Sequence, residues 1–228
     1  MIYLRKIFHL LFLILLVNLV VIQGQAQHDE HSHGKPGHGL SEDSLKMINQ
    51  IWDREWNQWR DSLFGIQIEE GMKIGEVGAG DGAFSALMAE QVGPNGFIYA
   101  NEVVSSKVDK IKDLMVSKEI ENMVAIQGEE NDALFPDNDL DMVIMVEVYH
   151  HIVNPSIFFE NLKKYLPRSG TLVIIDPDVN QPGGSLDGCY SDPDTTRSLL
   201  SELGYKNITV THKKIFNLDL YILQAFVN

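Results

Sequence analysis

The chain has 228 residues, of which 44% are hydrophobic and 22% charged, a composition typical of a globular protein with one sizeable core. Its formal net charge of −14 argues against nucleic acid and anionic membrane surfaces as partners, because both would repel it, and favours a neutral or cationic small molecule. The single cysteine, Cys189, excludes an internal disulfide and a cysteine-based metal cluster.

The N-terminus has the features of a secretory signal peptide. Arg5 and Lys6 precede an apolar run over residues 7–22, and Ala26 ends a short segment suited to cleavage. The apolar run is short for a membrane span, so cleavage after Ala26 is favoured over an uncleaved anchor. Either form predicts an exported domain, periplasmic or anchored facing the periplasm, with membrane contact only through such an anchor.

A polar linker and a tryptophan-bearing helix are predicted next. Residues 27–40 are rich in histidine and could bind metal, but a flexible tract lacks the groups that fix metal ligands, so a solvated spacer is favoured. From Ser41 to Leu63 the apolar residues recur at three- and four-residue steps, and all three tryptophans share that face. We expect this helix to pack on the core of a domain over residues 41–228; alternatively, one tryptophan covers a ligand pocket.

Glycines at alternate positions follow the short apolar run of residues 73–77. Gly78, Gly80 and Gly82 precede a helical pattern that begins at Ala83, which predicts a buried strand, a tight turn and a helix start. Glycine lets a ligand lie against the backbone, and a helix start offers N–H groups to polar ligands. The same glycines fit the dinucleotide fingerprint, so the pattern alone allows a nicotinamide or an adenosyl cofactor.

Strands and helices alternate along the rest of the chain. Strands are predicted at residues 97–102, 123–127, 141–146, 170–175, 208–215 and 218–227, and helices at 105–118, 155–166 and 194–203. Ser105 is the predicted cap of its helix. This order predicts an α/β fold with a Rossmann-like, doubly wound, mostly parallel seven-stranded sheet that ends in an antiparallel hairpin. The loop at residues 177–193 is long enough to carry function.

Glu102 ends the second predicted strand. Ligands of doubly wound sheets bind beyond the carboxyl ends of the strands. This carboxylate is therefore placed to accept hydrogen bonds from both hydroxyls of a ribose. Nicotinamide and adenosyl cofactors both contain a ribose, so Glu102 does not distinguish between these two kinds of cofactor.

Downstream segments resemble class I S-adenosylmethionine-dependent methyltransferases. Residues 128–143 are similar to the family's G-D-A-x-x-L-P-F-P-D-N-S-F-D-x-V block, residues 149–152 (Tyr-His-His-Ile) to its exit from the fourth strand, and residues 165–172 to its entry into the fifth. These landmarks occur in the family's order across residues 70–227. The resemblance implies a small-molecule enzyme, and the predicted signal segment would make it a secreted or membrane-anchored bacterial member of the family. A dehydrogenase is disfavoured because no second substrate domain is visible.

The resemblance implies S-adenosyl-L-methionine as the cofactor. The glycine turn would cradle its methionine part, Glu102 would hold the ribose hydroxyls, and two glutamates after the third strand would flank the adenine. The implied cofactor-binding residues are Glu76, Gly78, Ala79, Gly80, Gly82, Glu102, Glu129, Glu130 and Glu147.

Three positions depart from the family's pattern. Glu129 replaces an aspartate, Arg168-Ser169 replace a small turn, and Gly75 stands where a larger strand residue is usual. The missing side chain at Gly75 is expected to loosen packing slightly. None of these changes removes a cofactor group, so cofactor binding is expected to survive.

Candidate catalytic residues gather at the ends of the fourth and fifth strands. Methyl transfer requires the protein to orient the acceptor and, where the acceptor is protonated, to remove a proton. Glu147, His150 and His151 are selected, since histidine is a natural base near neutral pH, although the paired histidine is also a packing and turn element in the family. The other polar candidates at these strand ends are Tyr149, Asp176 and Asp178. A divalent cation between Glu147 and Asp176 is the alternative, but Pro177 replaces a further ligand, and no metal is predicted.

The sequence therefore predicts methyl transfer from S-adenosylmethionine to a small-molecule acceptor. The alternative is a non-catalytic, methyltransferase-like ligand-binding protein of the cell envelope. That alternative arises because the predicted export would take the domain away from the compartment in which its cofactor is made.

Overall fold

A computed structural model of the chain describes residues 63–180, 191–215 and 218–227. The predicted signal peptide and histidine-rich linker lie outside these residues, as do the tryptophan-bearing helix up to its last residue and most of the loop at 177–193. Within the described ranges, no helix is both long and apolar enough to span a membrane.

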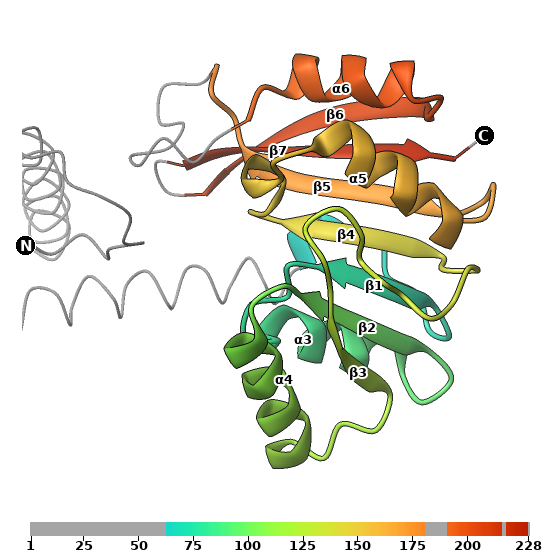
Figure 1. Cartoon of the computed structure of the whole chain (residues 1–228), viewed down its shortest axis with the longest axis vertical. Helices are drawn as coiled ribbons and strands as arrows, with labels where there is room; N and C mark the ends of the chain where they lie inside the picture. Colours follow the sequence, from blue (N-terminus) through green and yellow to red (C-terminus); the bar gives the residue numbers. More distant parts are fainter. Residues whose placement is uncertain (1–62, 181–190, 216–217, 228) are drawn as a thin grey trace, which may run out of the picture. The chain divides into compact units, whose positions relative to one another are not determined.

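Seven strands form one sheet in the order β3-β2-β1-β4-β5-β7-β6 (Figure 1). The first five are parallel, and β7 lies antiparallel between β5 and β6. The strands are β1 (Lys73–Val77), β2 (Phe97–Glu102), β3 (Met123–Gln127), β4 (Met142–Val146), β5 (Thr171–Pro177), β6 (Lys206–Ile215) and β7 (Leu218–Phe226). The predicted fold class is confirmed, including the antiparallel hairpin at the C-terminal end.

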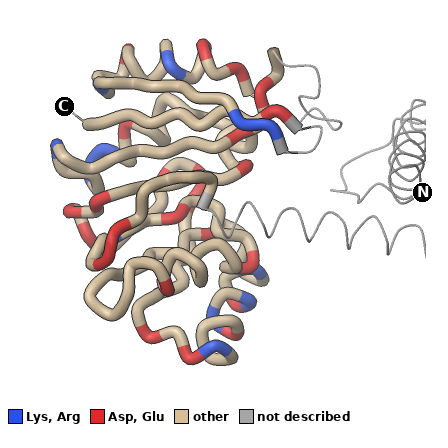
Figure 2. The backbone as a smooth tube through the Cα atoms, turned by 180° about the vertical axis from the view of Figure 1, so that it is seen from behind, with Lys and Arg blue, Asp and Glu red and all other residues tan. Residues whose placement is uncertain are grey.

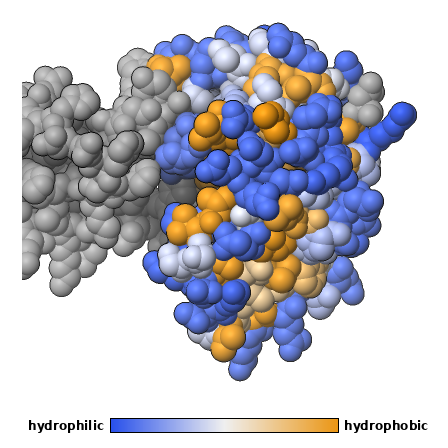
Figure 3. Space-filling model, viewed as in Figure 1, coloured by the Kyte–Doolittle hydropathy of each residue, from blue (hydrophilic) through white to orange (hydrophobic). Residues whose placement is uncertain are grey.

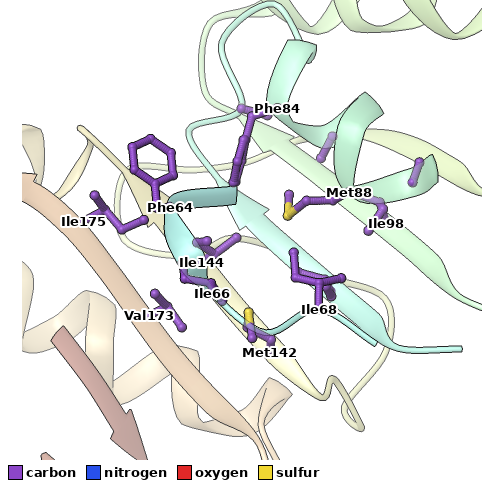
Figure 4. Packing of buried hydrophobic residues seen from close by; sticks show 14 of the residues in the cluster. Phe64, Ile66, Ile68, Phe84, Met88, Ile98, Met142, Ile144, Val173 and Ile175 are labelled. Atoms are coloured by element: carbon purple, nitrogen blue, oxygen red, sulfur yellow. The ribbon is translucent and has the colours of Figure 1, made fainter. Parts of the chain in front are cut away.

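Helices cover both faces of the sheet. They are α3 (Ala83–Val92), α4 (Ser105–Ser117), α5 (Pro155–Leu162) and α6 (Pro193–Glu202), with 3-10 turns η1 (Leu63–Gly65), η2 (Tyr149–His151) and η3 (Lys163–Tyr165). One buried cluster joins the sheet to α3 and α4, and a second joins it to α5 and α6. Phe64 and Ile66 from the segment before β1 complete the first cluster, where they pack beside Phe84 and Ile175 (Figure 4).

Two local predictions are wrong. Ser105 does not cap its helix: Val104 is the N-cap of α4, without a side-chain cap, and the Val104 amide instead donates a hydrogen bond of 3.0 Å to Glu102 Oε1. Packing at Gly75 is not loosened, because a Cβ there would lie 2.6 Å from Cζ of Phe135 and 3.0 Å from Cδ1 of Leu140. The buried ring of Phe135, from the loop after β3, fills the space that a larger strand residue would take.

The surface around these elements is mostly hydrophilic, and its apolar parts form small separate patches in the view of Figure 3. Basic positions include those along α4 and near the end of β6 (Figure 2). The acidic side chains that are buried instead lie at the carboxyl ends of the central strands, where Glu76, Glu102, Asp176 and Asp178 are at most 4% exposed. This edge of the sheet therefore holds the candidate site.

Candidate functional site

The glycine turn after β1 depends on backbone conformations that favour glycine. Gly78, Gly80 and Gly82 have φ values of 72°, 61° and 82°, all in the left-handed region. A Cβ at Gly78 would also lie 2.4 Å from Cγ2 of Val148, whereas a Cβ at Gly80 would meet no atom within 4 Å. The turn is thus packed at Gly78 and open at Gly80, as close approach of a ligand to the backbone requires.

Hydrogen bonds tie the end of β2 to this turn. The amide of Gly80 donates to Glu102 Oε2 at 3.0 Å, and the amide of Ala79 donates to the carbonyl oxygen of Asn101 at 2.8 Å. The other carboxylate oxygen, Oε1, accepts from the Val104 amide. A carboxylate offers about four acceptor positions, so Glu102 is fixed in place and retains capacity to accept from a diol.

Glu76 is a buried carboxyl group of β1. The hydroxyl of Ser85 on α3 donates to its Oε2. Burial raises the pKa of Glu76 to about 7, and the charges of Asp81 and Glu102 act in the same direction. Three acidic groups therefore surround the glycine turn, and such a set favours a ligand group of positive charge.

The loop after β3 lies beside the end of β2. Its backbone forms a bridge in which Glu129 and Asp132 exchange hydrogen bonds of 2.9 and 3.2 Å, and the side chains of Glu129 and Glu130 are exposed. Asp132 anchors the loop, because its carboxylate accepts from Tyr165 and Lys164 of η3. The two predicted adenine-flanking residues therefore lie on an anchored loop at the carboxyl edge of the sheet.

A second polar cluster joins the ends of β4 and β5. Glu147 follows β4 with a φ of 54°, which is uncommon for a residue with a side chain, and its amide donates to the carbonyl oxygen of Ile175 at 2.8 Å. Burial raises the pKa of Glu147 to about 7, the charge of Asp176 raises it further, and His150 opposes the shift. Backbone strain and a shifted pKa at one residue are typical of functional sites.

His150 and His151 both lie on η2 but in different environments. Nδ1 of His150 is 2.8 Å from Oδ1 of Asp176, and the two side chains are 6% and 0% exposed. His151 is exposed, and its ring centroid lies 4.1 Å from that of His150. The structure thus joins Glu147, His150 and Asp176 in one electrostatically coupled cluster and leaves His151 at its surface.

Comparison with known proteins identifies the family. A family model described as a methyltransferase domain matches residues 68–185, more than half of the chain. The chain belongs to this family of methyltransferase domains. A solved structure described as a SAM-dependent methyltransferase from Aquifex aeolicus superposes with a TM-score of 0.67 at 21% identity, covering 82% of this chain and 100% of that one. That likeness supports the shared fold.

Curated relatives have varied acceptors in their names. A protein-L-isoaspartate O-methyltransferase of Ignicoccus hospitalis is 27% identical over 117 residues, covering 51% of this chain and 52% of the relative. A demethylmenaquinone methyltransferase of Listeria monocytogenes is 23% identical over 128 residues, covering 55% of this chain and 54% of the relative. The chain spans about half the length of these curated relatives.

The predicted family and its cofactor, S-adenosyl-L-methionine, are confirmed by these matches. The site of the methyltransferase domain fits this cofactor chemically. Its ammonium and sulfonium groups are cationic, and the acidic groups around the glycine turn would attract them. The spare acceptor capacity of Glu102 suits a ribose, and the open side of Gly80 suits close contact with the backbone.

Sequence reasoning found the glycine turn and the strand-end carboxylates but missed Ser191 and Tyr221. Both side chains join the cluster around Asp176, through hydrogen bonds of 2.5 Å from Ser191 to Asp176 and 2.7 Å between Ser191 and Tyr221. No sequence motif marks either residue. In the three described ranges, no group of three or more His, Cys, Asp or Glu side chains is arranged to hold a metal ion.

Proposed function

We propose that the protein transfers a methyl group from S-adenosylmethionine to a small-molecule acceptor. The observation that carries this proposal is the hydrogen bond of 3.0 Å between the Gly80 amide and Glu102, which holds a carboxylate with spare acceptor capacity beside an open glycine turn. The match to the methyltransferase family indicates that the ligand bound at this carboxylate and turn is S-adenosylmethionine. The names of the relatives include both a protein acceptor and a quinone acceptor. The acceptor of this protein is therefore inferred from its own site.

In this proposal the cofactor-binding residues divide by element. Glu76 and the glycine turn bind the methionine part, Glu102 binds the ribose, and Glu129 and Glu130 flank the adenine. The burial of Glu76 and its pKa of about 7 support its pairing with a cationic group, since such a partner would stabilise the ionised carboxylate. The anchoring of the loop after β3 by Asp132 supports the adenine subsite.

The acceptor side of the proposed site is formed by Glu147, His150 and His151. When bound, the cofactor supplies an electrophilic methyl group. Glu147 is partly protonated near neutral pH because its pKa is about 7. Its carboxyl group can therefore either donate a hydrogen bond to the molecule that is methylated or accept one from it. His150 is held at Asp176, and His151 borders the cluster from the solvent side.

We also propose the layout and location of the whole chain. Residues 1–26 are a signal peptide or anchor, residues 27–40 a linker, and residues 41–228 the methyltransferase domain facing the periplasm. The charged, apolar and small-residue pattern of the first 26 residues supports export. Mass spectrometry of the mature N-terminus tests cleavage after Ala26. The non-catalytic alternative rests on the predicted export alone, and the relatives named above are all methyltransferases, which favours catalysis.

A labelled-methyl assay tests the proposed activity. The full chain is incubated with methyl-labelled S-adenosylmethionine and a cell-envelope extract, beside Glu102→Ala and the control Glu121→Gln at an exposed position. We expect the wild type and the control to transfer label to a small molecule. With Glu102→Ala, the amount of transferred label should fall at least tenfold. Binding of the cofactor without any transfer to the extract would contradict the proposed activity.

A further inference from the structure

A chain of side-chain hydrogen bonds runs from η2 through β5 to β7. His150 Nδ1 lies 2.8 Å from Asp176 Oδ1, and the Ser191 hydroxyl donates to Asp176 Oδ2 at 2.5 Å. The Ser191 Oγ lies 2.7 Å from the hydroxyl of Tyr221, which also lies 3.3 Å from Oγ1 of Thr196 on α6. Both oxygens of the Asp176 carboxylate are therefore engaged, one by the histidine and one by this supporting chain.

The strand register explains why these groups meet. Asp176 on β5 is paired with Tyr221 on β7, so their side chains lie on the same face of the sheet. Ser191 is brought to them by a bridge to Asp178, in which the Ser191 amide donates to the Pro177 carbonyl oxygen at 3.1 Å. Asp176 and Tyr221 are fully buried. A buried carboxylate that is bonded through both oxygens has a fixed orientation.

This fixed carboxylate determines which nitrogen of His150 carries the proton. An ionised carboxylate only accepts hydrogen bonds, so Nδ1 of His150 must donate to it. In the neutral ring, Nε2 then carries a lone pair. The contact with Asp176 is made by Nδ1, so Nε2 is the ring atom at which the neutral histidine can accept a proton.

We propose that Asp176 is a positioning residue that holds His150 with its Nε2 ready to remove a proton from a hydroxyl or an amine acceptor. This inference rests on the proposed function. The oxygen or nitrogen of the acceptor forms a bond to the methyl carbon, and the carbon–sulfur bond breaks with its electron pair going to sulfur. The proton of the acceptor O–H or N–H passes to Nε2 of His150, and the products are a methylated acceptor and a neutral thioether.

The groups that face His150 and Asp176 are consistent with this role. Glu147 faces both from the end of β4, Tyr149 and His151 face them from η2, and Tyr221 faces Asp176 from β7. Burial raises the pKa of Glu147 to about 7, and the charge of Asp176 raises it further.

A second Asp–His pair supplies a matched control. Oδ2 of Asp178, the residue that follows β5, lies 3.0 Å from Nε2 of His212. The His212 side chain is half exposed. That pair involves the opposite ring nitrogen, and Asp178 meets the chain from Asp176 to Tyr221 through its backbone bridge to Ser191, which Asp178→Asn retains. Loss of Asp178 should therefore leave the tautomer of His150 unchanged.

The first experiment reads the tautomer directly, without cofactor or acceptor. Nitrogen-15 NMR is recorded on the full chain labelled at histidine, with His150 assigned by its loss in His150→Gln. We expect the neutral ring of His150 to be protonated at Nδ1, the tautomer that free histidine disfavours, in the wild type and in Asp178→Asn. Asp176→Asn should abolish this preference and Ser191→Ala should weaken it. Protonation at Nε2 in the wild type overturns the proposal whether or not Asp176→Asn and Ser191→Ala fold.

The second experiment identifies the acceptor atom. The cell-envelope extract is supplied with carbon-13-methyl S-adenosylmethionine, and the methyl shift of the product reports its bonded atom. An O-methyl or N-methyl product supports the proposal, and a C-, S- or As-methyl product overturns it. His150→Gln should lower turnover by about 10²–10⁴-fold, with binding of S-adenosylhomocysteine changed less than about twofold. Unchanged turnover in His150→Gln also overturns the proposed role of His150. If the wild type does not bind S-adenosylhomocysteine at all, the proposed function is refuted instead.

Discussion

The carboxylate of Glu102 accepts a hydrogen bond of 3.0 Å from the backbone amide of Gly80. This bond connects the end of β2 to the turn after β1, so the residue assigned to the ribose and the turn assigned to the methionine part are one structural unit. The glycine at position 80 permits the bond, because its amide is presented from a left-handed conformation. Changes on either side of this bond should therefore affect cofactor binding more than folding.

The two glycines of the turn should respond differently to alanine. Gly78→Ala should destabilise the protein by about 3 kcal/mol, because the new Cβ would lie 2.4 Å from Val148 in addition to being strained. Gly80→Ala should cost only about 1 kcal/mol, since only the backbone strain is present. Urea unfolding of both variants measures the difference. Equal destabilisation would contradict the packing described for Gly78.

The contact between Gly75 and Phe135 predicts a rescue. Gly75→Ala should destabilise the protein by about 2 kcal/mol, because its Cβ would lie 2.6 Å from the phenylalanine ring. Phe135→Leu alone should also destabilise it, by removing buried aromatic surface. The double variant should be more stable than the sum of the single effects predicts, as a double-mutant cycle by urea unfolding will show. Strict additivity would mean that the two positions do not share this space.

Glu76 should make stability depend on pH. Its folded-state pKa of about 7 is above the ordinary value of 4.5, so the folded protein binds this proton more tightly than the unfolded chain does. The free energy of unfolding should therefore fall as pH rises from about 4.5 to 7, by about 3 kcal/mol from this group. Glu76→Gln should remove that part of the slope and make the protein more stable than the wild type at pH 8. Urea unfolding across this range provides the test, and parallel pH curves for the two proteins would contradict it.

Local sequence patterns were sufficient for much of this fold and for half of the site. The glycine turn and Glu102 are adjacent to strands with strong apolar patterns, so their positions at the carboxyl edge follow from the α/β order alone. The errors concern groups that interact across the chain. Ser105 is a good capping residue, yet the Val104 amide is bonded by Glu102, and the space at Gly75 is filled by Phe135.

The acceptor side was less accessible to sequence reasoning. Glu147 and His150 could be selected because they follow a strand, but the role of Asp176 depends on the pairing of β5 with β4 and β7. Tyr221 lies on the C-terminal hairpin, and Ser191 reaches the site through a single bridge. Tertiary contacts of this kind have no local periodicity, so no spacing rule would have identified the two hydroxyl groups.

Calorimetric titration with S-adenosylhomocysteine tests the central claim most directly, because it requires no knowledge of the acceptor. The wild type and the control Glu121→Gln should bind with equal affinity at micromolar ligand. Glu102→Gln should bind about 10–100-fold more weakly, since a hydrogen bond to a charged group contributes about 1.5–3 kcal/mol. No binding to the wild type at millimolar ligand, or an unchanged affinity in Glu102→Gln, would contradict a cofactor site formed by Glu102 and the glycine turn.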